Sequence, residues 1–388
     1  MGYINKERST RWPNSETIPL FIDPDNPISD EQKNHLLNVL DLEDVRVNFI
    51  IQTDNPTQPD HIRVSRDDSI NAKGEYGIII NGQDIGVPGR HPDATHHFIK
   101  LRSTATAEDI RHELGHALGL FHEHQRSDAG TFIVLEISNI KPSSMQFVNP
   151  IIDNHLLTIG QYNYDSMMHY PEIMPNHSVD ASQPIYTKTP LPVDPNEPAF
   201  LSPNHADMYT IKLMYGIGKS LDLGDVSKSV LVLKRVLDAL DYGIGPFDIE
   251  LDQTTLESVV EFHEDKNLGF TDTVTSATWN KLGSKLPFIM IGGEGEDTLH
   301  LGAVGPQVKT LQCILFSLGF DLGITGDPPN TGIDGQYGQR TGKALVRLKK
   351  DSRILSENAS INNNTTTVDS NTRNMLSSLL KDGIDWPE

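Results

Sequence analysis

The spacing of three histidines constrains this chain more than any other feature. His112, His116 and His122 lie in the stretch HELGHALGLFH. His112 and His116 are four residues apart, so in a helix both imidazoles lie on one face, about one turn apart. Gly119 allows the chain to leave helical geometry, after which His122 can return towards the other two rings. The spacing therefore predicts a helix that begins after Thr106 and ends at Gly119, followed by a turn.

Three neutral imidazoles around one divalent ion leave a coordination position open, which is typical of catalytic rather than structural zinc. Glu113 follows the first histidine and can reach that position, where a carboxylate acts as general base towards water and then as acid. We therefore predict one catalytic Zn²⁺ and hydrolysis of peptide bonds. A bare HExxH also occurs in unrelated helices, but a glycine and a third histidine at fixed offsets make chance matches rare. The nearby histidines are predicted to be surface residues or supports of the ligands: His91, His96, His97 and His124.

The segment HELGHALGLFHEHQRSD resembles the zinc motif of the astacin-like metallopeptidases, within the metzincin group, and YNYDSMMHY at 162–170 resembles the Met-turn of that family. The resemblance spans roughly residues 12–216. It implies that Met168 forms a hydrophobic floor under the zinc, and that Tyr170 is a further zinc ligand that swings away to stabilise the tetrahedral intermediate. It also implies that Glu123 pairs with a mature N-terminal ammonium group, the alternative being an exposed acid at a helix end. The usual disulfides of the family are missing, because the one cysteine, Cys313, lies outside this region.

The first 217 residues are predicted to form an α+β catalytic domain of metzincin type, with a mixed twisted sheet and an active-site helix. A Ser-x-x-Gln capping box at Ser29 predicts a helix through Leu40, and a last helix is expected at 206–214. Residues 132–203 are rich in Pro, Asn and Ser and are predicted to be mostly loops. Short apolar runs predict strands at 17–22, 45–52, 61–65, 76–80 and 98–101.

The remainder of the chain contains an internal repeat. Its first helix carries Val230, Leu233, Leu237, Leu240 and Tyr242, which recur at identical spacing as Val308, Leu311, Leu315, Leu318 and Phe320. We predict two all-α three-helix modules, at 221–284 and 299–382, joined by a linker at 285–298 that contains GGEGE at 292–296. A polar insert at 356–367 is expected to be a mobile loop. The modules resemble peptidoglycan-binding-like units, which implies either cell-wall glycan or peptidoglycan as partner, or a spacer, autoinhibitory or protein-docking role.

Net charge and the lengths of the apolar runs limit the kinds of partner and surroundings that the chain favours. The formal net charge of -21 disfavours nucleic acid and anionic membranes, which would repel the protein on average. No apolar run approaches the roughly 18 residues of a membrane helix, and the first 16 residues lack the apolar region of a signal peptide. The protein therefore stays inside, leaves by another route, or is given without its leader; the family resemblance favours secretion. Proteins or peptides are the expected substrates. The alternatives are a peptidase for peptidoglycan cross-links and a binding protein with a vestigial metal site.

Overall fold

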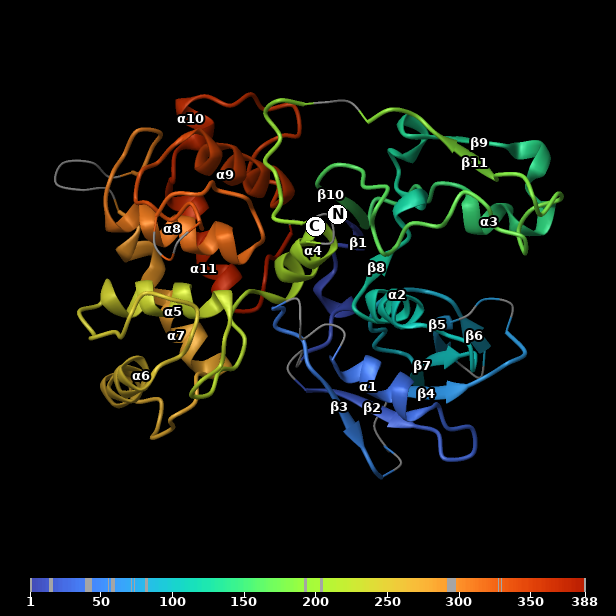
Figure 1. Cartoon of the computed structure of the whole chain (residues 1–388), viewed down its shortest axis with the longest axis horizontal. Coiled ribbons are helices and arrows are strands. Elements are labelled where there is room, and N and C mark those ends of the chain that lie inside the picture. The colour runs from blue at the N-terminus through green and yellow to red at the C-terminus, as the bar shows by residue number, and fades with distance from the viewer. Residues whose placement is uncertain are drawn as a thin grey trace. The chain divides into compact units, whose positions relative to one another are not determined.

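The structure is a computed structural model that forms two compact units (Figure 1). Unit 1 comprises residues 1–43 and 47–193, and unit 2 comprises residues 44–46 and 194–387. The structure describes the chain apart from residues 1, 14–16, 39–43, 55, 57–59, 71, 73, 81–82, 192–193, 203–204, 292–297, 327, 329 and 387–388.

Unit 1 contains a six-stranded mixed sheet with strand order β3-β2-β4-β7-β5-β6. Strands β3, β2, β4 and β7 are parallel, whereas β5 is antiparallel to both β7 and β6. Helix α2 (Ala107–Ala117) packs against β5 and against α1 (Asp30–Asn38). The strands are β2 (Ile18–Ile22), β3 (Phe49–Gln52), β4 (Ile62–Arg66), β5 (Gly74–Ile80), β6 (Gln83–Ile85) and β7 (His96–Leu101).

The strands predicted at 17–22, 61–65, 76–80 and 98–101 are confirmed, with ends that differ by at most two residues. The strand predicted at 45–52 is wrong in its first half, because only Phe49–Gln52 pairs with a neighbour. Sequence patterns also missed a three-stranded sheet of order β10-β1-β8, made of β1 (Gly2–Asn5), β8 (Leu120–Phe121) and β10 (Leu156–Ile159). Strands of two to four residues are too short for an alternating pattern to stand out.

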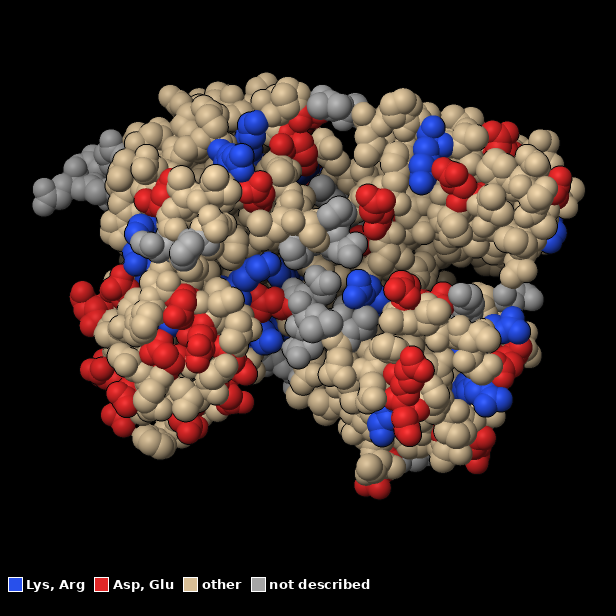
Figure 2. Space-filling model, in the orientation of Figure 1, with Lys and Arg blue, Asp and Glu red and all other residues tan. Residues whose placement is uncertain are grey.

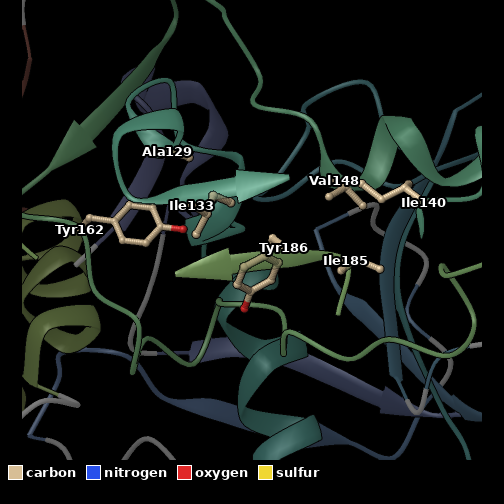
Figure 3. Packing of buried hydrophobic residues seen from close by; sticks show 7 residues of the cluster. All are labelled: Ala129, Ile133, Ile140, Val148, Tyr162, Ile185 and Tyr186. Carbon is tan, nitrogen blue, oxygen red and sulfur yellow. The ribbon is translucent and has the colours of Figure 1, made fainter. Parts of the chain in front are cut away.

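Residues 132–188 are mostly loops and short 3-10 turns, as predicted, but they enclose a small core of their own (Figure 3). Strand β9 (Ile133–Leu135) pairs with β11 (Tyr186–Lys188), and α3 (Met145–Val148) adds a single turn. The buried side chains of this core are Ala129, Ile133, Ile140, Val148, Tyr162, Ile185 and Tyr186.

Unit 2 is helical in its described residues, and the helix predicted at 206–214 is confirmed as α4. Helix α5 packs against α8, and α7 packs against α11. The helices are α4 (His205–Tyr215), α5 (Lys228–Asp238), α6 (Gln253–Lys266), α7 (Ser276–Ile289), α8 (Pro306–Ser317), α9 (Gln339–Asp351), α10 (Asn363–Thr366) and α11 (Ser370–Leu380).

The internal repeat of the sequence has a structural counterpart in unit 2. A β-bridge joins Leu221 to Val274 in the first copy, and a corresponding bridge joins Leu299 to Val368 in the second. Five residues further along each copy, a second bridge joins Val226 to Glu250 in the first copy and Val304 to Gln336 in the second. The same two bridges therefore occur in both copies, in the same order.

The insert at 356–367 is not a bare loop, because it contains α10, whose first turn is capped by Asn362. It is also fastened to α9, where the Lys349 ammonium donates to the carbonyls of Thr365 and Thr367 at 3.1 and 3.0 Å. The GGEGE linker at 292–296 lies outside the described residues.

The division into two units falls at 193/194, whereas the sequence suggested a domain end at 217. Helix α4 belongs to unit 2, where the Tyr209 hydroxyl donates to Asp351 at 2.9 Å. The boundaries of independently folding domains remain a prediction.

No helix among the described residues is long and apolar enough to cross a membrane. Figure 2 shows acidic side chains gathered around the part of unit 2 that contains α5 and α6.

Cys313 is buried in α8 and forms no disulfide.

Candidate metal centre

Helix α2 carries the first two histidines and begins and ends where its sequence predicts. Thr106 is the N-cap, and its side chain and backbone form a capping box with Asp109. This arrangement satisfies amide groups that the first turn leaves unpaired, and Asp109 also opposes the positive end of the helix dipole. Gly119 has a φ of +103°, a conformation that favours glycine, and its amide donates to the His116 carbonyl at 2.9 Å.

The chain then returns through β8 and brings His122 to the other two histidines. The Nε2 atom of His122 lies 3.2 Å from that of His112 and 3.1 Å from that of His116. Two nitrogens bound tetrahedrally to zinc at 2.0–2.1 Å would lie about 3.3 Å apart. Among the described residues, these three form the one group of His, Cys, Asp or Glu side chains whose ligand atoms converge closely enough to hold a metal.

Each of the three imidazole rings is also oriented through its other nitrogen. The Nδ1 atom of His112 lies 2.7 Å from the carbonyl oxygen of Met167. The Nδ1 atom of His116 lies 2.7 Å from the carbonyl oxygen of Leu120. The Nδ1 atom of His122 lies 2.9 Å from the Gln125 side-chain oxygen. Carbonyl acceptors fix the proton on Nδ1, so that each Nε2 presents a lone pair.

Burial keeps the imidazoles of His116 and His122 neutral, as a metal ligand must be. It lowers the pKa of His116 to about 3 and depresses the pKa of His122 well below its ordinary value, and neighbouring histidines add to both effects. The donor set, its spacing and its protonation therefore fit a zinc ion, with three protein ligands and a coordination position left for water or substrate.

Glu113 lies on α2 beside β5 and is 6% exposed. Without a metal, burial raises the pKa of its carboxyl group to about 8, the charge of Glu75 adds to the rise, and a hydrogen bond from the Tyr76 amide opposes it. The close approach to β5 depends on Gly74, since a Cβ there would lie 2.6 Å from Glu113 Cγ. The carboxyl group is thus held beside the histidines, on a helix and against a strand.

Tyr170 lies beside the third histidine. Its ring centroid is 4.3 Å from that of His122 and 6.5 Å from that of His112. The His124 ring stacks on it at 4.3 Å, and the Tyr186 hydroxyl donates to its carbonyl at 2.5 Å. Burial, followed by the charge of Glu113, raises the pKa of the phenol to about 12, so it remains a hydrogen-bond donor at neutral pH.

Met168 lies under α2 and is 1% exposed. A Cβ on Gly115 would come within 2.5 Å of its sulfur, so the glycine inside the HELGH motif allows the methionine to approach the helix between the two histidines. The Met168 carbonyl also accepts the amide of Glu123 at 3.0 Å, which ties the Met-turn segment to the residue after His122.

Glu123 is fully buried, so the alternative of an exposed acid at a helix end is wrong. Its carboxylate pairs with Arg126 at 2.9 Å and accepts the Asn163 amide at 2.9 Å. The expected pairing with a mature N-terminal ammonium stays a prediction, since residue 1 lies outside the described residues.

Sequence reasoning missed several residues that build the site. Trp12 donates from its indole to the Ala117 carbonyl at 2.8 Å and so anchors the end of α2. The sequence analysis also does not identify Gln125, Gly74 or Gly115, although Gly115 lies between the two helical histidines of the motif. Of the other histidines, His124 supports Tyr170, whereas His97 is buried against Trp12 with ring centroids 4.8 Å apart.

Comparison with known proteins gives an independent view of this region. Residues 89–215 match the profile of the astacin peptidase family. Astacin-like metalloprotease toxin 1 of Loxosceles intermedia is 43% identical over 61 residues, which cover 16% of this chain and 23% of the toxin. Zinc metalloproteinase nas-14 of Caenorhabditis elegans is 42% identical over 69 residues, covering 16% of this chain and 13% of that protein.

High choriolytic enzyme 1 of Oryzias latipes is 39% identical over 92 residues, which cover 23% of this chain and 30% of the enzyme. The chain thus spans less than a third of the length of these relatives. A solved structure of high choriolytic enzyme 1, described as a hatching enzyme zinc-protease, aligns with 49% of this chain and 86% of its own. The two chains share 22% sequence identity at a TM-score of 0.36. The stretch 89–215, which holds the three histidines, Glu113 and Tyr170, therefore matches the astacin family of peptidases.

Proposed function

We propose that this protein is a zinc-dependent endopeptidase that hydrolyses internal peptide bonds of proteins. The observation that carries the proposal is the convergence of the His112, His116 and His122 imidazoles, with Glu113 on the helix that carries the first two. The match of this region to a peptidase family and the names of its relatives, which include a zinc metalloproteinase, support the same reaction class.

His112, His116 and His122 would hold the ion, which supplies Lewis acidity towards a water molecule and towards the carbonyl oxygen of the substrate. Glu113 takes the proton from the attacking water, and later delivers it to the leaving amine.

Tyr170 has the role of a donor to the oxyanion of the tetrahedral intermediate, and of an additional ligand in the resting state. Its phenol is neutral and its ring lies against His122. A hydrogen-bond donor held in place before charge develops lowers the barrier without reorganisation at the moment of reaction.

The test of the mechanism is Glu113→Gln, which keeps the shape of the side chain and removes the base. Casein hydrolysis should fall at least about 100-fold, while metal analysis still finds one zinc per chain. The matched control is Glu108→Gln, an exposed acid on the same helix, which should retain activity. Full activity of Glu113→Gln would refute the mechanism, and zinc binding without any hydrolysis by the unaltered protein would favour a vestigial site.

We also propose that the helical modules at 221–284 and 299–382 tether or orient the peptidase, and that the protein acts outside the cell. The duplicated bridges of unit 2 support a repeated module, and similarity to relatives named as toxin and choriolytic enzyme supports secretion. Incubation with casein and with purified cell wall separates a general endopeptidase from a peptidoglycan peptidase, and sedimentation with cell wall tests the modules as anchors.

A further inference from the structure

The three ligand histidines differ in what holds them. His112 and His116 point Nδ1 at backbone carbonyls, whereas the acceptor for His122 Nδ1 is the side chain of Gln125. A backbone carbonyl can only accept a hydrogen bond, but an amide side chain can present either an accepting oxygen or a donating NH₂ group. The orientation of this one amide therefore decides which nitrogen of His122 carries the proton.

The surroundings of Gln125 fix that orientation. Its side-chain NH₂ donates to the carbonyls of Gln146 and Asn149 at 3.2 and 3.4 Å, and its backbone carbonyl accepts the Ile151 amide at 2.8 Å. The residue is 6% exposed, so water cannot readily replace these partners. Turning the amide over would set its oxygen against two carbonyl oxygens and its NH₂ against His122. The oxygen must therefore face His122, whose Nδ1 must carry the proton.

We infer that Gln125 is the positioning residue of the third ligand: by accepting the Nδ1 proton of His122, it directs the Nε2 lone pair to the metal. The inference rests on the proposed function, because it presumes that the three histidines bind zinc. The segment 146–151 contains no zinc ligand, but its carbonyls at Gln146 and Asn149 hold the Gln125 amide in this orientation.

Gln125→Met tests the inference, since methionine has similar length but offers no acceptor of comparable strength. Zinc affinity, measured on the full chain by competition with a chromophoric chelator, should weaken about 10- to 100-fold. Gln125→Glu keeps an acceptor oxygen for His122 Nδ1 but sets its second oxygen against the carbonyls of Gln146 and Asn149. It should therefore destabilise unit 1 in urea titrations yet weaken zinc binding less than Gln125→Met, which a purely structural role of the amide would not predict.

Gln32→Met is the matched control. Gln32 is 3% exposed, its NH₂ donates to the carbonyls of Arg102 and Ala105 at 2.9 and 3.4 Å, and its oxygen accepts the Ser29 amide at 3.2 Å. It is thus a buried amide of unit 1 with the same kind of partners but no ligand histidine among them, and its loss should leave zinc affinity unchanged.

The outcomes separate the two proposals. Failure of the unaltered protein to bind one zinc per chain would refute the proposed function. Zinc binding by the unaltered protein together with equal affinity in Gln125→Met would overturn the role of Gln125 alone. Equal weakening in Gln125→Met and Gln125→Glu would overturn it too, because the acceptor oxygen would then not be what matters.

Discussion

Replacing Arg126 by methionine should strongly destabilise unit 1, because it strands a buried negative charge. Arg126 is 1% exposed and Glu123 is fully buried, and their charged atoms are 2.9 Å apart. At an effective dielectric constant of about 20, that separation corresponds to an attraction of about 6 kcal/mol. The guanidinium also donates to the carbonyls of Gly160 and Gln161 at 2.9 and 3.1 Å, which would lose their donor.

Methionine has no charge that must lose its water on folding, and this offsets part of the loss. The free energy of unfolding is therefore expected to fall by about 3–5 kcal/mol, as for other broken buried pairs. That is a large part of the roughly 5–15 kcal/mol that typically holds a domain folded. Pulse hydrogen exchange of peptides from 107–135, followed by mass spectrometry across a urea series, reads the stability of unit 1 within the full chain.

Arg66→Met is the control, because Arg66 pairs with Asp68 at 2.8 Å while both side chains are exposed, and such a pair contributes less than about 1 kcal/mol. Adding Glu123→Gln to Arg126→Met should recover part of the loss, since the buried charge is then gone. The reasoning fails if Arg126→Met costs no more than Arg66→Met, or if the second substitution destabilises further.

Three other changes can be checked on the same protein. Gly115→Ala should lower the free energy of unfolding by about 1–3 kcal/mol and weaken zinc binding, because its Cβ would meet the Met168 sulfur at 2.5 Å. Its control is Gly130→Ala, where the space is open and zinc affinity in the same chelator competition should not change. Gly74→Ala should lower kcat for casein by displacing the Glu113 carboxylate; unchanged kcat would show that the contact is dispensable. Burial raises the pKa of Glu197 to about 7, partly opposed by Arg347, so its protonated form stabilises unit 2 fully below about pH 4.5 and the benefit is lost as the pH rises through 7. Glu197→Gln should therefore flatten the decline in unfolding free energy over that window, about 3 kcal/mol at most, in urea titrations at pH 5 and pH 8.

The sequence was most informative where one local motif carries several constraints. The N-cap residue Thr106, the two histidines one turn apart and Gly119 define α2 and its end without reference to the rest of the chain. The parallel strands were also predictable, because each is a short apolar run between turn residues.

What the sequence could not reveal depends on residues far apart along the chain. Trp12 meets Ala117 across 105 positions, and the hydrogen bonds from Gln125 run to Gln146 and Asn149. Neither has a local pattern that distinguishes it from an ordinary buried side chain. Glu123 was judged by its place after a helix, yet its burial is set by packing around Arg126 and Asn163.

The position of β1 has a practical consequence for handling this protein. Ile4 lies opposite Leu120 in the β10-β1-β8 sheet, and the carbonyl of Leu120 holds the His116 ring. The amino end is thus continuous, through a single strand pairing, with the scaffold of the metal centre. A deletion or a tag junction that breaks the pairing of Ile4 with Leu120 is therefore expected to weaken zinc binding, so fusion partners are better placed away from β1.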